Sequence, residues 1–462
     1  MLERYTNVGS GIAAGSAAES IRTVAPHARV TMISAEPDSL YSLYSRPALS
    51  RPVKGEISQG QLHLRSAEQL ALLELERLST YVRSINRATH EVTTGDGRTL
   101  PYDRLLLATG AASLPPSLPG ASLRGVVVLD GIRDAHRMLL LARGARAAVV
   151  VGGGSTAIEM AEGLNARGLL TLYLMRGGRC WTRVLDEVES GLVESRLGRK
   201  GVRLLRHTSV ARAVGVHGRL RWVETVEGDK LECDVLAVSD GVRPRVQLAV
   251  AAGLDADRGI VTNGFLQTSD ADIFAAGDAA QMRDESGRPG TLDTLWTSAE
   301  QQGRCAGLNM TGAWRRFVMP LPINVTRLAG VPVTIAGAVG GASDPDLLAI
   351  TRGQSERWDV QFGTRSVGGR RDDDRLRLVL QDGVVMGVLA MGMEELLRPL
   401  DALIGARVPA GVLRQARRAG EEAALDILTG YCNSLRGDGV AYTHAGIAPH
   451  PVQLDARMES GA

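Results

Sequence analysis

Cysteine is scarce in this chain, and its placement argues against two kinds of chemistry. The 462 residues include four cysteines, which occur singly, with no CxxC pair and no cysteine–histidine cluster at metal-ligand spacing. We therefore expect neither a metal site nor a local redox disulfide. The four are Cys180, Cys233, Cys305 and Cys432.

The chain also lacks long apolar runs and any strong excess of charge. No segment approaches the roughly 20 uninterrupted apolar residues that a membrane helix needs, and the charged start MLERYTN is unlike a signal peptide. The formal net charge of +2 gives no reason to expect nucleic acid or an anionic membrane as a partner. The GxSxG, HExxH and Walker motifs are absent. We expect a cytoplasmic protein of about three domains.

The N-terminal unit has the pattern of a dinucleotide-binding site. A short strand is followed by Gly9 for the tight turn, Gly11 where backbone N–H groups reach a pyrophosphate, and Ala14 at the helix-packing position. The next predicted strand, RVTMISAE, ends in Glu36, at a distance suited to binding ribose hydroxyls. An ordinary strand–helix turn is the alternative, because the chain is rich in glycine, with 54 residues.

A second unit repeats this pattern about 140 residues later. An apolar strand leads into a helix, STAIEMAEGLNARG, with Gly152, Gly154 and Ala157 in the three fingerprint positions. The strand after it, LLTLYLMR, has no acid for the ribose; Met175 and Arg176 stand there. Arginine accommodates a 2′-phosphate, so the sequence favours NADPH slightly over NADH, with a solvated arginine loop as an equal alternative.

Three further segments have small or acidic residues at predicted strand ends. YDRLLLATGA places Thr109 and Gly110 after one strand, LECDVLAVSDGVRP repeats that shape after the second unit, and DIFAAGDAAQ leads a strand into Gly277 and Asp278. An acid at a strand end accepts hydrogen bonds from sugar or ribityl hydroxyls. Each signal is weak by itself, and their order carries the information.

In that order, together with YSRPALS at residues 44–50 and LWTSAEQQGRCAGLNMTG near residue 300, the chain resembles the FAD-dependent pyridine nucleotide oxidoreductases. It looks most like the branch of rubredoxin and ferredoxin reductases and the flavin domain of NAD(P)H nitrite reductases. The resemblance covers roughly residues 5–400. It implies a resident FAD and NAD(P)H as a diffusing substrate.

The resemblance also implies roles for individual residues. Gly9, Gly11 and Glu36 would hold the ADP half of FAD, and Arg46 and Asp278 its pyrophosphate and ribityl side. The segment from Trp296 to Gln302 would lie near the isoalloxazine. The nicotinamide seat would be lined by Gly152, Gly154 and Glu159.

Position 51 departs from the family pattern. The family often has a lysine there, near the flavin, which pairs with the glutamate at the position of Glu159; this chain has Arg51. Arginine keeps the charge that stabilises a reduced flavin but does not give up its proton. We therefore predict that Arg51 and Glu159 pair and act by electrostatics and positioning. The alternative is a surface arginine in a solvated loop.

The route of the electrons beyond the flavin follows from a missing thiol. The stretch LYSLYSRPALSRP contains no cysteine, whereas disulfide-reductase relatives have one there, so a thiol, coenzyme A disulfide or peroxide reductase is not expected. Cys180 and Cys305 are expected to be structural. The resemblance implies that the electrons leave to an iron–sulfur or rubredoxin-type acceptor protein.

The C-terminal part predicts strands and then a helix. PINVTRLAGVPVTIAGAV and DDDRLRLVLQDGVVMGVLAMG read as strands, the second with a hairpin turn at QDG. They resemble the C-terminal domain of the same branch, except that Met393 stands where the family often has an acid. GVLRQARRAGEEAALDILTG predicts one amphipathic helix, and the last 26 residues predict an extended tail.

The complete pattern predicts an α/β fold with two Rossmann-like nucleotide-binding domains and a small α/β C-terminal domain, the NAD(P) domain being inserted into a discontinuous FAD domain. The expected bounds are 1–113 and 243–316 for the FAD domain, 114–242 for the NAD(P) domain, 317–410 for the C-terminal domain and 411–462 for the helix and tail.

The predicted function is FAD-dependent NAD(P)H oxidation with electron transfer to an iron–sulfur or rubredoxin-type protein, alone or as the flavin subunit of a larger complex. Two alternatives stay open. One is a flavin subunit of a multisubunit dehydrogenase whose degenerate nicotinamide site serves assembly. The other is an NAD(P)H oxidase that uses oxygen.

Overall fold

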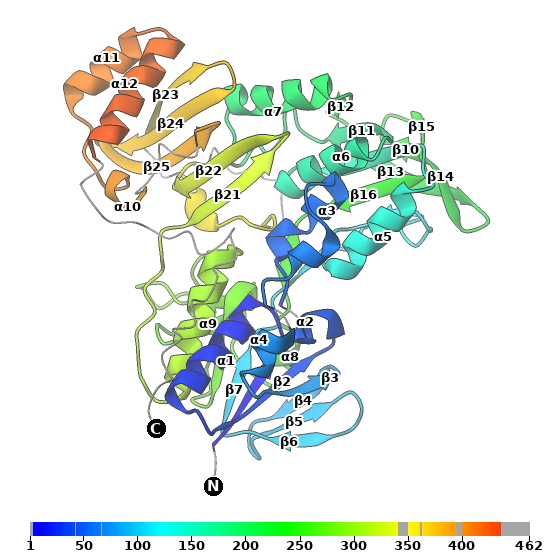
Figure 1. The fold of residues 1–462 in the computed structure, drawn as a ribbon, viewed down its shortest axis with the longest axis vertical. Helices are drawn as coiled ribbons and strands as arrows, with labels where there is room; N and C mark the ends of the chain where they lie inside the picture. Colours follow the sequence, from blue (N-terminus) through cyan, green and yellow to red (C-terminus); the bar gives the residue numbers. More distant parts are fainter. Residues whose placement is uncertain are drawn as a thin grey trace, which may run out of the picture.

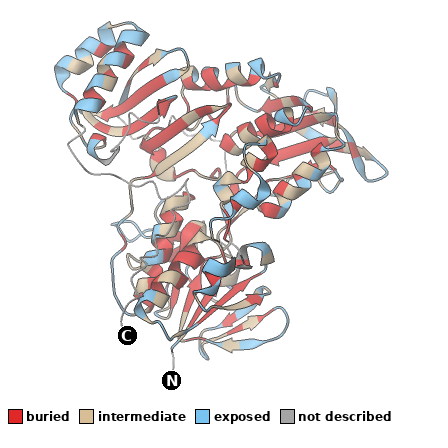
Figure 2. Cartoon of the chain, viewed as in Figure 1, coloured by how far each residue is buried: buried red, intermediate tan, exposed pale blue. Residues whose placement is uncertain are grey.

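Three five-stranded sheets organise the chain, each covered by helices (Figure 1). The computed structural model describes residues 3–41, 43–65, 67–340, 350–360, 363–393 and 400–435. The extended tail predicted at the C-terminus lies outside the described residues. The strands of all three sheets are the most buried parts of the ribbon, and the outer helix faces are exposed (Figure 2).

The first sheet is parallel and is built from two distant parts of the chain. Its strand order is β19-β7-β1-β2-β3, and every neighbouring pair is parallel. The strands are β1 (Arg4–Val8), β2 (Arg29–Ser34), β3 (Glu76–Ser79), β7 (Arg104–Leu107) and β19 (Ile273–Ala275). Since β19 follows the second nucleotide unit in sequence, the chain leaves this sheet and returns to it.

Helices α1 (Ile12–Val24) and α9 (Trp296–Met310) pack closely beside this sheet. A Cβ at Gly303 would lie 2.1 Å from the carbonyl oxygen of Ala13, and one at Gly307 would lie 2.4 Å from that of Ala17. The small residues therefore let the two backbones approach. This contact fixes the start of α9 beside the first glycine turn.

The second sheet is also parallel, with the order β12-β11-β10-β16-β9. Its central strand carries the apolar run predicted for a sheet covered on both faces. The strands are β9 (Val126–Val127), β10 (Ala147–Gly152), β11 (Leu170–Met175), β12 (Arg203–Arg206) and β16 (Val235–Ser239). The helices of this unit include α5 (Ile132–Ala142), α6 (Ser155–Ala166) and α7 (Glu187–Arg199).

The third sheet is antiparallel, with the order β21-β22-β25-β24-β23. Its strands are β21 (Ile323–Leu328), β22 (Val331–Gly337), β23 (Arg365–Arg371), β24 (Asp374–Gln381) and β25 (Val384–Met391). The hairpin predicted at QDG joins β24 to β25 through Asp382 and Gly383, whose φ values are 50° and 82°. Two positive φ angles match the twist of a two-residue hairpin turn.

The single helix predicted after this sheet is wrong, because the chain forms two. Helix α11 (Ala410–Arg418) ends before Ala419, whose backbone is extended, and Gly420 caps the start of α12 (Glu421–Ser434). The resulting helix pair covers one face of the third sheet, with α12 against β23 (Figure 1). The apolar pattern was continuous, but the chain reverses at Gly420.

Short elements complete the described chain. They comprise two three-stranded antiparallel sheets, two two-stranded pairs and short helices. The strands are β4 (Val82–Asn86), β5 (Glu91–Thr94), β6 (Thr99–Pro101), β8 (Ala111–Ser113), β13 (Val210–Val216), β14 (Arg219–Thr225), β15 (Lys230–Glu232), β17 (Val242–Pro244), β18 (Ile260–Thr262) and β20 (Ala280–Met282). The short helices are α2 (Pro37–Tyr41), α3 (Ser50–Lys54), α4 (Ala67–Ala71), α8 (Gln247–Ala251) and α10 (Leu400–Leu403).

The architecture confirms the predicted fold class. Two parallel sheets, each with a glycine turn between its central strand and a helix, are the two Rossmann-like units, and the antiparallel sheet with its helix pair is the C-terminal α/β unit. Strands β8 and β17 pair where the chain passes between the first two units. The domain bounds to the residue stay a prediction.

Candidate functional site: two dinucleotide seats

The glycine turn of the first unit fits a pyrophosphate. Gly9 has a φ of 127°, and a Cβ there would lie 2.1 Å from the carbonyl oxygen of Ala108, so the turn needs glycine. Gly11 precedes α1, and a Cβ at this position would meet no atom within 4 Å. Ala14 is fully buried against the sheet. The first turn of α1 contains no acidic residue, so its N–H groups are open to an anion.

The acid and the arginine predicted to bind FAD meet beside this turn. Glu36 forms an ion pair with Arg46 and accepts a hydrogen bond from the hydroxyl of Tyr44. Nη1 of Arg46 also donates to the carbonyl oxygen of Asp130 at 2.8 Å. Burial raises the pKa of Tyr44, so its phenol keeps the donated proton at neutral pH. The structure therefore brings these two predicted residues together.

Two arginines that sequence reasoning missed join this group. The side chains of Arg245 and Arg352 both pair with Asp130, the former at 3.0 Å. Burial opposes ionisation of Asp130, but the charges of Arg352 and Arg245 hold its pKa below the usual range. Arg245 had a visible signal, since it follows a predicted strand in DGVRPR. Arg352 had none, because it comes from the C-terminal unit, 222 residues after Asp130.

The predicted residues at the strand ends lie around the same arginine cluster. The hydroxyl of Thr109 donates to the carbonyl oxygen of Arg245 at 2.8 Å, and the carbonyl oxygen of Gly110 accepts from the backbone N–H of Arg245 at 2.9 Å. Burial raises the pKa of Asp278, and the charges of Arg352 and Arg46 oppose that rise. A buried carboxylate held among cations is suited to accept hydrogen bonds from sugar-like hydroxyls.

The start of α9 contributes the remaining predicted flavin residues. The backbone N–H of Gly277 donates to Oε1 of Gln302 at 2.9 Å, which ties the turn after β19 to α9. Trp296 is half-buried at the first position of α9. A glycine turn with no side chain against Gly11, a cluster of arginines and an acid are the groups that FAD needs for its pyrophosphate and ribityl chain. The first seat thus fits FAD.

The second glycine turn has the same backbone but a different neighbourhood. A Cβ at Gly152 would lie 2.5 Å from the carbonyl oxygen of Ser239 and 2.9 Å from Cβ of Ala157, so glycine is required here too. Gly154 precedes α6, and a Cβ at this position would lie 2.5 Å from Cγ2 of Thr351. The first seat has open space at the equivalent glycine, whereas the second has a side chain of the C-terminal unit.

The arginine that suggested a 2′-phosphate is partly exposed at the end of β11. Nη2 of Arg176 lies 3.7 Å from a carboxylate oxygen of Asp240, and about half of the arginine side chain is accessible. An exposed ion pair of this length is weak. Arg176 therefore has an acidic neighbour but is free to turn toward a ligand phosphate.

The predicted pair of Arg51 and Glu159 does not form. Arg51, in α3, has its Nε 3.2 Å from a carboxylate oxygen of Glu56, just after this helix, and Glu159 accepts a hydrogen bond from the hydroxyl of Thr326 at 3.1 Å. The cation whose charge acts on Glu159 is Lys54, while burial raises the pKa of this glutamate. Lys54 was not predicted from the sequence, because the cation that acts on Glu159 was expected at residue 51, where the family often has a lysine.

Close packing of α3 on α6 explains how Lys54 reaches this place. A Cβ at Gly163 would lie 3.0 Å from Cγ1 of Val53, so the glycine lets the short helix approach the long one. Nζ of Lys54 then lies 3.1 Å from Glu162, and the lysine side chain is only 4% exposed. The lysine is one helical turn after position 51. The cation beside Glu159 and Glu162 is therefore residue 54 and not residue 51.

Metal-binding clusters and disulfides are absent from the part of the chain that the structure describes. No group of three or more histidine, cysteine or acidic side chains in it is placed to hold a metal ion. Its cysteines are all free thiols, and burial raises the pKa of Cys180, which is fully enclosed. None of its helices is long and apolar enough to cross a membrane.

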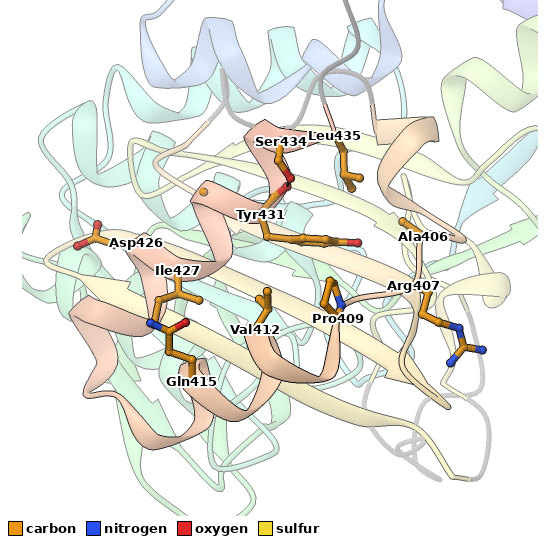
Figure 3. Close-up of a pocket in the computed structure, with 11 residues that line it drawn as sticks. Ala406, Arg407, Pro409, Val412, Gln415, Asp426, Ile427, Tyr431, Ser434 and Leu435 are labelled. Atoms are coloured by element: carbon orange, nitrogen blue, oxygen red, sulfur yellow. Dashed lines mark hydrogen bonds between the residues drawn. The ribbon is translucent and has the colours of Figure 1, made fainter.

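A separate pocket of about 630 Å³ lies in the C-terminal unit, between α11, α12 and the loop before them (Figure 3). In the close-up, Tyr431 and Val412 lie at its centre, with Arg407 and Asp426 at opposite sides. Its lining combines apolar, polar and charged side chains, and none of these residues belongs to either nucleotide seat. The lining residues are Ala406, Arg407, Pro409, Val412, Gln415, Asp426, Ile427, Gly430, Tyr431, Ser434 and Leu435.

Two Rossmann-like units, each with a glycine turn before its helix, define an α/β oxidoreductase of the two-dinucleotide type. Comparison with known proteins gives the family: residues 6–303 match the pyridine nucleotide-disulphide oxidoreductases, and the chain belongs to this family. The family predicted from the order of the motifs is therefore confirmed. The resemblance implies FAD and NAD(P)H as cofactors, and the two seats provide one binding site for each.

Individual relatives agree with this assignment. The chain is 28% identical over 410 residues to the ferredoxin–NAD(+) reductase component of the biphenyl dioxygenase system of Paraburkholderia xenovorans, covering 88% of this chain and 94% of that protein. It is 27% identical over 343 residues to the assimilatory nitrate reductase electron transfer subunit of Bacillus subtilis, covering 73% of this chain but only 43% of that protein.

A chain of a solved complex has a similar fold. The reductase chain of the covalent putidaredoxin reductase–putidaredoxin complex matches with a TM-score of 0.76 at 23% sequence identity, over 88% of this chain and 94% of that one. At this level of identity the match shows the common fold.

Proposed function

We propose that this protein is an FAD-dependent NAD(P)H oxidoreductase that passes electrons to an iron–sulfur or rubredoxin-type acceptor protein, alone or as the flavin subunit of a larger complex. The observation that carries the proposal is the presence of two dinucleotide seats in one chain, with Glu159 and Lys54 beside the second. The relative from Paraburkholderia xenovorans, which is similar over nearly its whole length, is a ferredoxin reductase component by name.

Bound FAD would supply hydride acceptance and one-electron release. The chain's own residues bind and orient. The N-terminus of α1 and the cluster of Arg46, Arg245 and Arg352 would hold the pyrophosphate, and Asp278 the ribityl hydroxyls. The charge of Lys54 would act with Glu159 to position the nicotinamide end, since hydride transfer needs aligned rings and no protein nucleophile.

The acceptor is proposed from what surrounds the flavin seat. The segment from Leu40 to Pro52 contains no cysteine, and Cys180 is buried with a raised pKa. A thiol is already reduced, and one with so little thiolate does not readily cycle through a disulfide. An external one-electron carrier is therefore the acceptor that the chain leaves open. Cytoplasmic location stays a prediction.

The test is anaerobic reduction of the FAD-loaded protein. We expect the flavin band near roughly 450 nm to bleach with NADH or NADPH, and the reduced protein to reoxidise when a [2Fe–2S] ferredoxin or a rubredoxin is added. A matched control replaces the carrier with air, because an NAD(P)H oxidase would turn over rapidly with oxygen alone. A flavin that saturating NADH and NADPH both fail to bleach contradicts the proposal.

One observation favours a second candidate, a flavin subunit of a multisubunit dehydrogenase in which the nicotinamide fold serves assembly. Thr351 fills space at Gly154 where a dinucleotide would bind. This candidate predicts that a partner subunit, and not NAD(P)H, reduces the flavin. Reduction by nicotinamide alone excludes it.

A further inference from the structure

A five-residue segment of the C-terminal unit, Ile350–Gln354, lies between the two nucleotide seats; we call it the 350–354 strap. The carbonyl oxygen of Ile350 accepts a hydrogen bond from the backbone N–H of Val242 at 2.9 Å, at the junction between the units. Two residues later, Arg352 pairs with Asp130 in the flavin seat. Thr351, between them, faces the second glycine turn.

Thr351 contacts the glycine at which a dinucleotide pyrophosphate would sit. A Cβ at Gly154 would lie 2.5 Å from Cγ2 and 3.0 Å from Cβ of Thr351, and the threonine is 4% exposed. The middle glycine of the fingerprint is needed so that the backbone can approach the pyrophosphate. A threonine branch in van der Waals contact with this glycine takes part of that volume.

The first seat of the same chain serves as an internal comparison. Gly11 has the same position in its fingerprint, and a Cβ there would meet nothing within 4 Å. Neither α1 nor α6 has a side chain that caps its first turn by a hydrogen bond. The seats therefore differ in the side chain that lies against the middle glycine, which is Thr351 at Gly154 only, and not in the backbone of the turn.

Polar anchors hold the strap. The backbone N–H and the hydroxyl of Thr294 donate to the carbonyl oxygen of Gln354 at 3.0 and 2.9 Å, and Asn324 donates to the carbonyl oxygen of Gly353 at 2.8 Å. The amide nitrogen of Gln354 is buried without a hydrogen-bond partner, and Gly353 has a φ of 73°. Ile350 also packs in a small apolar cluster with Val242 and Leu292. The unsatisfied buried donor of Gln354 lowers the cost of local opening compared with global unfolding.

We propose that the 350–354 strap competes with the pyrophosphate of NAD(P)H for the second seat, so that the nicotinamide binds only when Thr351 leaves Gly154. This inference rests on the proposed function, in which NAD(P)H is the reductant. The apparent affinity for the dinucleotide is then the intrinsic affinity reduced by the fraction of molecules in which the strap is open. Thr351 is a specificity-determining residue in this scheme, since its bulk sets that fraction.

Displacement of the strap also changes the flavin seat. Arg352 directly follows Thr351, and its guanidinium acts on both Asp130 and Asp278. Moving the strap away from Gly154 therefore withdraws a positive charge from beside the flavin pyrophosphate and ribityl positions. Nicotinamide binding and the flavin environment are coupled through two adjacent residues.

The test uses ADP-ribose, which has the pyrophosphate of NAD(P)H but no nicotinamide and so reports binding without hydride transfer. Its affinity for the FAD-loaded full chain is measured by calorimetry for wild type, Thr351→Ala and Thr351→Val. Alanine removes both branches of the side chain, whereas valine keeps the volume and loses only the hydroxyl, which donates to Oε1 of Gln354. We expect about tenfold tighter binding in Thr351→Ala and a smaller gain in Thr351→Val, because valine still fills the space beside Gly154.

A second measurement checks the contact itself in case the alanine variant alters the strap elsewhere. Gly154→Ala places a methyl group against Thr351, so it should lower the thermal midpoint of the FAD-loaded protein. The same substitution in the Thr351→Ala background should lower it less, and this coupling marks direct contact.

Equal ADP-ribose affinity in wild type and Thr351→Ala overturns the proposal, as does a lack of binding by both or a lack of coupling in the thermal cycle. These results are separate from a failure of the proposed function, which is judged by flavin bleaching with saturating NADH or NADPH. If NAD(P)H bleaches the flavin but substitution of Thr351 leaves the ADP-ribose affinity unchanged, the proposed function stands and the competition by the strap is disproved.

Discussion

Nζ of Lys54 lies 3.1 Å from a carboxylate oxygen of Glu162, one turn of α6 beyond Glu159, with both side chains almost fully buried. Lys200 contacts the other oxygen of Glu162 at 2.6 Å. The charge that a family pattern places at residue 51 is thus found at residue 54, within a network of lysines and glutamates between α3 and α6.

Removal of Lys54 should therefore cost more than removal of Arg51. Lys54→Met leaves Glu162 with an incomplete buried network, and we expect a loss of about 3 kcal/mol in the free energy of unfolding. Arg51→Ala breaks a partly exposed pair with Glu56 and should cost less than about 1 kcal/mol. Urea unfolding of the FAD-loaded variants measures both, and flavin reduction should slow in Lys54→Met only. Equal costs would contradict the assignment.

Glu159 should make stability depend on pH in a definite direction. Burial raises its pKa in the folded protein above the ordinary glutamate value of 4.5. Below that value the carboxyl is protonated in the folded and unfolded states, and its protonated form carries no desolvation cost. Protonated Glu159 therefore contributes stability at low pH. As the pH rises through the folded pKa, its carboxylate becomes charged in the folded protein, and this contribution to the free energy of unfolding is lost. Glu159→Gln should thus gain stability over wild type at pH 8, with the gain vanishing toward pH 4. A constant difference across this range would disprove the raised pKa.

A buried ion pair should fasten the C-terminal unit to α7. The guanidinium of Arg377 contacts both carboxylate oxygens of Glu189 at 2.7 and 2.9 Å, and Glu189 is fully buried. Arg377→Met leaves the buried carboxylate of Glu189 with only a longer contact to Arg375, at 3.8 Å, so we expect a loss of about 3 kcal/mol in the free energy of unfolding. The exposed pair Arg371–Asp426 is the matched control, and Asp426→Asn should cost less than about 1 kcal/mol.

The double variant Arg377→Met/Glu189→Met should recover much of that loss, because it removes both charges of this pair, while Arg375 keeps its pair with Asp186. A single variant that unfolds at the same urea concentration as wild type would show that the two units are held by other contacts.

We expect the cysteines to take no part in electron transfer. Burial raises the pKa of Cys180, and it raises that of Cys233 to about 12, so little thiolate exists at neutral pH. We expect both thiols to react with a disulfide reagent only after denaturation. Cys180→Ala and Cys305→Ala should keep the rate of flavin reduction. A loss of acceptor reduction in either variant, with flavin bleaching intact, would point to a thiol relay.

Arg176 should decide between the two nicotinamides. If it binds a 2′-phosphate, Arg176→Ala should lower the ratio of kcat/KM for NADPH to that for NADH by about tenfold, or about 1.4 kcal/mol. Asp240→Asn removes the carboxylate 3.7 Å away and should raise the same ratio. An unchanged ratio in both variants identifies Arg176 as a solvated surface residue.

Local patterns were enough for the two nucleotide folds. Each glycine turn lies within one strand–turn–helix segment, so the spacing of glycines and apolar residues fixed the backbone path at Gly9, Gly11, Gly152 and Gly154. The hairpin at QDG followed from turn chemistry in the same way. The prediction of a single helix after the third sheet was wrong, because an apolar pattern continues across Gly420, where the chain reverses.

The amino-acid sequence by itself determined most of the elements, the two glycine turns and the family, because these depend on residues a few positions apart. Only the tertiary structure decided which side chains meet at the seats. Lys54 reaches Glu162 because α3 packs on α6 over Gly163, and Arg352 reaches Asp130 across 222 residues. The closeness of Thr351 to Gly154 likewise depends on how a C-terminal segment crosses two other units. Such contacts join separate segments whose spacing along the chain carries no signal.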